Sequence, residues 1–429
     1  MTLMKRALFL FSLLLLFSGL SLTIPAEAAP PAMDLEECIE RALANHPDLA
    51  AGRADLAASE ARTGQTRAGT YPSIGFSSGF SERSSTGSGP SEGSWSSGIT
   101  LSQVVSDWGR SHISLKRSLL DVEGKDLALV AKRSDIMFEV TRSYYQVLKT
   151  GKNLEVAEET LSLNDERLEQ AEAFFRVGRV SRYDVTAAQV SKSNANLALV
   201  QARTAGKEAM TSLKAAMGSP DLPDFSVVDI GDDPEASFSA GLPSLEAAVG
   251  SALEKRPDLK SYRVSLASAE AAVSLARLDN APKLDLSGSF GWGSTDFWGQ
   301  DSWRAGMTLS FPLYDGGLRR EKLLEASANL EGAEARLESY RQQVLKDVTS
   351  AWLAASDSTE MAAAAAEGLR MASENLEIAT GRYKTGVGSP LEVSDATKNF
   401  AEAKAAWFGA LYDGMTARAA LEKAMGVIR

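Results

Sequence analysis

Cysteine and histidine are almost absent from this sequence, and their scarcity excludes several classes of protein. Cys38 is the only cysteine, so no disulfide can form within the chain. His46 and His112 are the only histidines and lie in unlike contexts, and together with Cys38 they give no metal-ligand spacing. No nucleotide-binding glycine motif follows a strand pattern. We therefore expect no catalytic residues, no metal and no cofactor, and predict that the protein is not an enzyme.

An excess of basic residues is also lacking, and long apolar runs are confined to the N-terminus. The formal net charge of −11 argues against nucleic acid as a partner. Lys5 and Arg6 precede an apolar run over residues 7–20, and small residues follow at 26–28, which predicts a signal peptide over residues 1–28. No later run is long enough for a membrane helix, so a membrane-spanning mature chain would have to cross with strands.

The sequence does contain a tandem duplication. The segment around Gly178 and Ser181 recurs 208 residues later around Gly386 and Ser389. The stretch Pro-Asp-Leu at 47–49 recurs in the same way at 257–259. We therefore divide the mature chain into a first repeat over 29–218, an inter-repeat segment over 219–243 and a second repeat over 244–429. The inter-repeat segment is rich in Pro, Asp, Gly and Ser, and we expect it to wrap outside the helices at mid-length.

Each repeat begins with a helix and then contains two segments in which apolar residues alternate with small polar ones. We predict strands over 73–83 and 95–105, and over 283–294 and 302–313. Each is about ten residues, the length of a tilted membrane strand with one apolar face. The tryptophans near their ends, where an aromatic belt would lie, are Trp95, Trp292, Trp298 and Trp303. A half-buried soluble hairpin explains the strand pattern equally well, but the secretion signal and the duplication favour the membrane.

Long proline-free segments follow the second strand of each repeat. They predict helices over 111–177 and 318–385, each on the order of 100 Å long, and return helices over 181–217 and 389–426. Alanine recurs every seventh residue in both return helices, at Ala188, Ala195, Ala202, Ala209 and Ala216 and at Ala396, Ala403, Ala410, Ala417 and Ala424. This spacing predicts coiled-coil packing, although the helix propensity of alanine also explains its abundance.

The fold class that follows is mainly α, with a membrane β part. Four strands cannot close a membrane barrel, and open edges in lipid leave backbone groups without partners. A chain that spans with these strands must therefore share one barrel among several copies. The alternative is a periplasmic structural coiled coil or adaptor-type binding protein without a pore.

The order of these elements resembles the TolC-like outer-membrane efflux proteins over essentially the whole mature chain. The resemblance is carried by the duplicated Pro-Asp-Leu start, the Asp-Gly-Gly-Leu-Arg turn at 315–319 and the Tyr-Lys-Thr-Gly tip at 383–386. It implies a homotrimer with a twelve-stranded barrel in the outer membrane of a Gram-negative-type bacterium, continued by an α-helical periplasmic tunnel. It also implies an exit duct for efflux or secretion that docks to a periplasmic adaptor (membrane fusion) protein and an inner-membrane pump.

The same resemblance assigns roles at the tips. It places the adaptor contacts at Gly178, Ser181, Asp184, Gly386 and Ser389. It places the periplasmic gate at Glu392 and Asp395, with Tyr383 helping to latch the closed state. The family's basic latch partner falls here on Gly388, so any latch must differ. A threefold carboxylate ring would favour cations, although a capping acid in the first helical turns explains Glu392 almost as well.

Overall fold

The computed structural model describes residues 32–83, 92–223, 225–229, 241–294 and 300–428. The signal peptide predicted over 1–28 and Trp298 lie outside these residues. The first repeat contains α2 (Leu35–Asn45), α3 (Pro47–Ala68), β2 (Ser73–Arg83), β3 (Glu92–Ser106), α4 (Arg110–Arg176) and α5 (Arg182–Ala216). The second contains α7 (Leu245–Lys255), α8 (Pro257–Arg277), a short 3₁₀ turn (Leu278–Asn280), β5 (Lys283–Ser294), β6 (Gln300–Ser310), α9 (Leu318–Lys384) and α10 (Pro390–Ala424).

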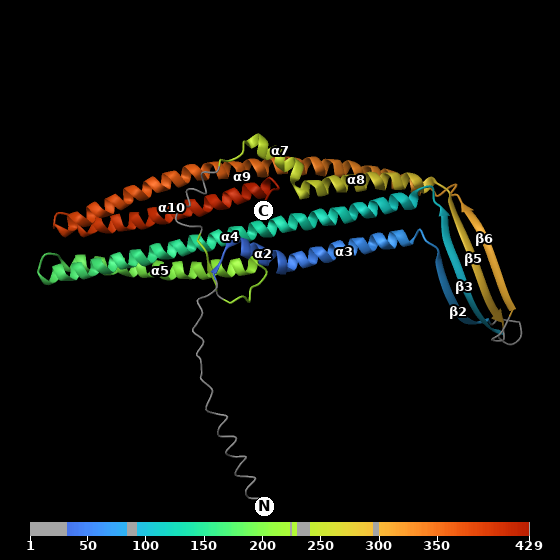
Figure 1. Ribbon diagram of the computed structural model, residues 1–429, viewed down its shortest axis with the longest axis horizontal. Helices are drawn as coiled ribbons and strands as arrows, with labels where there is room; N and C mark the ends of the chain where they lie inside the picture. Colours follow the sequence, from blue (N-terminus) through green and yellow to red (C-terminus); the bar gives the residue numbers. More distant parts are fainter. Residues whose placement is uncertain (1–31, 84–91, 224, 230–240, 295–299, 429) are drawn as a thin grey trace, which may run out of the picture.

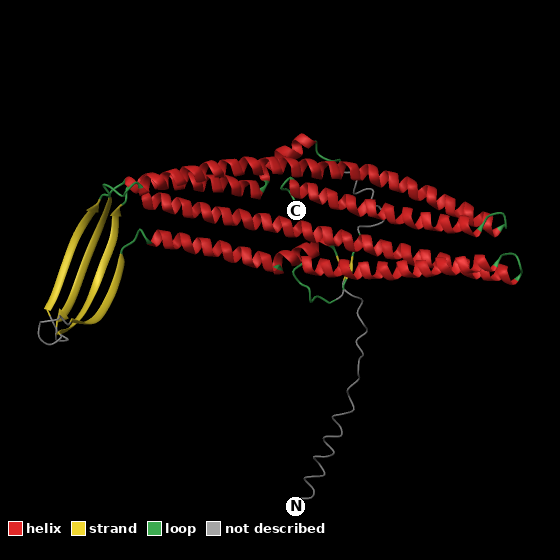
Figure 2. Cartoon of the chain, turned by 180° about the vertical axis from the view of Figure 1, so that it is seen from behind, coloured by secondary structure: helices red, strands yellow, loops and turns green. Residues whose placement is uncertain are grey.

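The four long strands form one antiparallel sheet in the order β2-β3-β5-β6, so the pairing of β3 with β5 joins the two repeats. Figures 1 and 2 show this sheet at one end of the helical body, with none of the described helices packed on either face. The strand predicted over 302–313 ends at Ser310, two residues before Pro312, which has no N–H for the ladder.

One face of the sheet carries an apolar row that crosses all four strands. Phe76, Ile99, Phe290 and Trp303 are direct cross-strand neighbours. Phe76 is 67% exposed and Trp303 is 79% exposed in the single chain. Trp95 and Trp292 lie on the same face near the strand ends remote from the helices. The opposite face carries the small residues Ser77, Gly98, Gly291 and Ser302 in the matching row.

The helical body consists of two long antiparallel hairpins. The 67-residue helices α4 and α9 run its whole length, and each packs against its own return helix, α5 or α10. The repeats meet where α4 contacts both α8 and α10. All ten alanines of the heptad series are buried or half-buried, so the spacing marks the packed face of the return helices. Among the described residues, no helix has both the length and the apolar composition needed to cross a membrane.

The largest hydrophobic core lies at mid-length, where Cys38, Tyr144, Leu213 and Leu411 are almost fully buried. Part of the inter-repeat segment closes this core. Its residues Ser226–Val227 form β4, which pairs in parallel with β1 (Ala32–Met33). The Tyr144 hydroxyl donates a hydrogen bond to the Val228 carbonyl. No sequence periodicity indicates this two-residue pairing.

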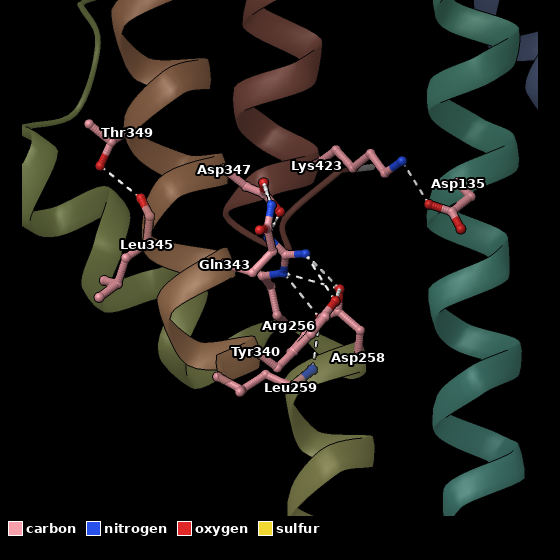
Figure 3. Close-up of polar contacts among 10 residues, drawn as sticks. All are labelled: Asp135, Arg256, Asp258, Leu259, Tyr340, Gln343, Leu345, Asp347, Thr349 and Lys423. Atoms are coloured by element: carbon pink, nitrogen blue, oxygen red, sulfur yellow. Dashed lines mark hydrogen bonds and ion pairs between the residues drawn. The ribbon is translucent and has the colours of Figure 1, made fainter. Parts of the chain in front are cut away.

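A second mid-length feature is a polar network within repeat 2, and beside it an ion pair joins repeat 2 to repeat 1 (Figure 3). Arg256, between α7 and α8, donates to the Asp258 carboxylate from Nε and Nη2 at 3.0 and 2.7 Å. The Tyr340 hydroxyl of α9 donates to the same carboxylate at 2.6 Å. Nearby, Lys423 of α10 lies 2.7 Å from Asp135 of α4. Burial alone would raise the pKa of Asp258, but the hydrogen bonds from Arg256 and Tyr340 hold that pKa below its ordinary value.

The substitution Asp258→Asn tests the contribution of this network to stability. It removes the charge that accepts from Arg256 and Tyr340, so we expect a loss of about 2 kcal/mol in the free energy of unfolding at neutral pH. The measurement is chemical unfolding in detergent, followed by far-ultraviolet circular dichroism.

The pH dependence of this loss has a definite sign. Because the folded-state pKa of Asp258 is lowered, the stabilisation is fully present above the unfolded pKa of about 3.9 and disappears as the pH falls through the folded value. The difference between Asp258→Asn and the wild type should therefore shrink below about pH 4. Asp126→Asn, at an exposed position of α4, is the control and should change stability by no more than about 0.5 kcal/mol. Equal losses in the two variants would contradict the assignment.

Candidate functional site at the helical tips

The two helical hairpins end in tips of the same backbone design, at the end of the molecule remote from the sheet (Figure 2). Gly178 (φ 72°) and Gly386 (φ 83°) each adopt the left-handed conformation just after a long helix ends. The amide of Arg179 donates to the Phe174 carbonyl at 2.9 Å, and the amide of Val387 donates to the Arg382 carbonyl at 3.0 Å. Glycine is favoured here because a side chain would be strained at positive φ.

The serine that follows each glycine caps the return helix. The Ser181 hydroxyl accepts from the Asp184 amide at 3.4 Å, and the Asp184 carboxylate accepts from the Ser181 amide at 2.9 Å, which makes a capping box. The Ser389 hydroxyl accepts from the Glu392 amide at 3.2 Å, with Pro390 in the first turn. The predicted adaptor-contact residues therefore all lie at the tips, and each also has a local structural role.

The two tips of one chain touch each other. A pocket of about 390 Å³ lies between them. Its lining includes Phe174, Gly178, Arg179, Ser181 and Asp184 from repeat 1 and Tyr383, Gly386 and Pro390 from repeat 2. The Arg179 guanidinium lies over the Phe174 ring, 5.4 Å from its centroid. The structure thus brings five of the predicted tip residues, from both repeats, around one concave surface.

Tyr383 is a core residue of this tip. Its side chain is 5% exposed and belongs to a small cluster with Ala379, Val393 and Ala396. Its ring meets the Phe174 ring edge-on, with centroids 5.9 Å apart, so the two hairpins are joined by an aromatic contact. Burial raises the pKa of the Tyr383 phenol, which therefore remains protonated at neutral pH.

The two predicted gate acids are exposed. Glu392 and Asp395 are three residues apart on α10 and so lie close together on the helix surface. The Glu392 carboxylate is 3.8 Å from the Arg382 guanidinium. In the part of the chain that the structure describes, no three His, Cys, Asp or Glu side chains are placed to hold a metal ion.

Sequence reasoning missed Phe174 and Arg179, which line the pocket, and it also missed Arg167. Arg167 lies on α4, yet its Nη2 donates a hydrogen bond to the carbonyl of Pro390 in the other repeat. Its Nη1 is buried and has no hydrogen-bond partner among the described residues. Burial lowers the pKa of this guanidinium, whereas interactions with Tyr383 and Asp395 oppose the change. The repeat pattern gave no signal for Arg167, because the equivalent position in repeat 2 is Asn375.

Comparisons with known proteins agree with this architecture. The family model of the outer membrane efflux protein matches residues 38–219 and 248–427. CyaE of Bordetella pertussis is 28% identical over 403 residues, covering 90% of this chain and 84% of CyaE. TolC of Vibrio cholerae is 24% identical over 408 residues, covering 92% of this chain and 91% of TolC.

Among solved structures, the CmeC outer membrane channel of Campylobacter jejuni superimposes with a TM-score of 0.81 at 20% identity. The match covers 92% of this chain and 85% of CmeC, so the likeness extends from the sheet to the tips. Because the family model spans both repeats, this chain belongs to the outer membrane efflux protein family.

Proposed function

We propose that this protein is an outer-membrane exit duct for efflux or secretion, which three copies form together and which receives its cargo at the helical tips. The observation that carries the proposal is the uncovered apolar row over four strands, placed at the opposite end of the molecule from the tips. Family membership favours this function over a periplasmic coiled-coil or adaptor-type binding protein without a pore.

The sheet supports the assembly part of the proposal. Its apolar face suits lipid, its small polar face suits water, and Trp95, Trp292 and Trp303 suit an aromatic belt at one membrane surface. Strands β2 and β6 are the sheet edges, and their outer backbone groups have no strand partner among the described residues. An open edge in lipid costs several kcal/mol per unpaired group, so three sheets joined edge to edge into a twelve-stranded barrel remove that cost.

The tips support the docking part. Gly178, Ser181, Gly386 and Ser389 are exposed and Asp184 is half-buried, and all of them except Ser389 line the shared pocket. A periplasmic adaptor protein would dock at this surface and connect the duct to an inner-membrane pump. In a trimer, Glu392 and Asp395 would ring the periplasmic mouth and form a cation-favouring gate. The buried contact of Tyr383 with Phe174 holds the two tips of a chain together.

The lipid-facing assignment is tested by a pair of neighbouring substitutions on β2. Phe76→Arg places a charge on the apolar face, at a cost of about 2–4 kcal/mol near the bilayer midplane. We expect it to reduce strongly the amount of heat-modifiable oligomer in the outer-membrane fraction. Ser77→Arg adds the same side chain to the opposite face and should leave most of the oligomer intact. A soluble oligomer that forms equally in both variants would exclude the membrane sheet.

The gate is tested by replacing both Glu392 and Asp395 with alanine. Removal of the carboxylates should raise single-channel conductance in planar bilayers, on the order of twofold, and weaken the preference for potassium over chloride. The control is Asp357→Ala with Glu360→Ala, which removes two exposed acids with the same three-residue spacing from α9. Unchanged conductance and selectivity in the tip variant would reject the gate.

A further inference from the structure

Arg167 makes a hydrogen bond between the two repeats near the tips. Its side chain leaves α4 of repeat 1 and reaches the first residue of α10 in repeat 2, where Nη2 donates to the Pro390 carbonyl. The two residues are 223 positions apart in the chain. This hydrogen bond from a charged donor fixes the start of the helix that carries both gate acids.

The second arm of the guanidinium is unusual. Nη1 is buried and has no partner among the described residues, although a buried charged donor without an acceptor costs free energy. Such a group in a native structure calls for an explanation. Asp395 follows Pro390 on α10 by about one and a half turns, and its negative charge acts to raise the pKa of this guanidinium.

The hydrogen bond between Arg167 and Pro390 has no counterpart with the two repeats exchanged, because the equivalent residues differ. The equivalent of Arg167 in repeat 2 is Asn375, which is exposed. The equivalents of Pro390 and Asp395 in repeat 1 are Arg182 and Ala187. Donor and acid are therefore each present once per chain, in different repeats, and the fold brings them to the same interface.

We infer that Arg167 is a further gate residue, which ties the N-terminus of α10 to α4 and offsets the charge of Asp395. This inference rests on the proposed function. Since Gly388 supplies no basic latch partner, the guanidinium comes from the other repeat. The hydrogen bond from Arg167 to Pro390 holds the repeat-2 tip against the repeat-1 tip of the same chain. The positive charge of Arg167 also reduces the negative charge that Asp395 contributes to the periplasmic mouth.

The inference is tested by single-channel recording of the full-length oligomer in potassium chloride. Arg167→Gln removes the charge and the charged donor to the Pro390 carbonyl. The fraction of time in the high-conductance level should therefore rise about tenfold, the effect of losing one charge-assisted hydrogen bond. The substitution should also raise the preference for potassium over chloride, because Asp395 is no longer offset. Arg167→Lys keeps the charge and can supply one donor, as Nη2 does, so it should leave the ion preference unchanged and raise the open fraction less than Arg167→Gln.

The double variant Arg167→Gln with Asp395→Asn separates a charge effect from a merely structural one. The rise in potassium preference should disappear in this variant, because the acid that Arg167 offsets is gone. Arg142→Gln is the control, since Arg142 is an exposed arginine of the same helix that pairs with Glu139 one turn away. It should behave as the wild type.

The outcomes distinguish this inference from the proposed function. If Arg167→Gln and Arg167→Lys both match the wild type, while the Glu392 and Asp395 replacements still change conductance, the role of Arg167 is wrong and the duct stands. If potassium preference rises equally in Arg167→Gln and in the double variant Arg167→Gln with Asp395→Asn, the inference that Arg167 offsets the charge of Asp395 is wrong. If the wild-type protein forms no channel at all, the proposed function itself fails.

Discussion

The antiparallel pairing of β3 with β5 is the contact on which the arrangement of the whole molecule depends. It joins the last strand of repeat 1 to the first long strand of repeat 2, so two homologous halves share one sheet. The helices that leave that sheet are thereby set side by side, and α4 packs against both α8 and α10. At the far end, the same alignment brings Phe174 against Tyr383 and Arg167 against Pro390. The sheet register at one end and the packing of α4 on α10 along the body are therefore both consistent with the tip residues that meet.

Much of this fold can be read from periodicity. Alternation around Phe76 and Phe290 marks strands, the heptad alanines mark the packed helix face, and a glycine followed by a serine marks each tip. Each of these signals lies within a short stretch of sequence, and each occurs twice because the chain is duplicated. The pairing of Ser226–Val227 with Ala32–Met33 has no such signal, because two residues are too few to show a period.

The chemistry of the site was predictable only in part. The caps and stops at Ser181, Ser389, Gly178 and Gly386 follow from local backbone needs. The role of Arg167 could not be predicted from local sequence, because its partner Pro390 is in the other repeat and the equivalent residue in repeat 2 is Asn375. The two tips therefore share a backbone design, while their side chains differ where the repeats meet. Duplication explains the scaffold, and departures from the duplicated pattern locate the residues that distinguish one tip from the other.

The solitary Cys38 gives the protein a practical property. Its side chain is completely enclosed in the mid-length core, and burial raises the pKa of its thiol to about 11. It stays protonated and inaccessible to maleimide reagents at neutral pH, because the thiolate is the reactive species. A cysteine introduced at either tip would therefore be the sole labelled position in each chain. Spin labels or fluorophores attached there would report tip separation directly, with the natural sequence as an unlabelled background.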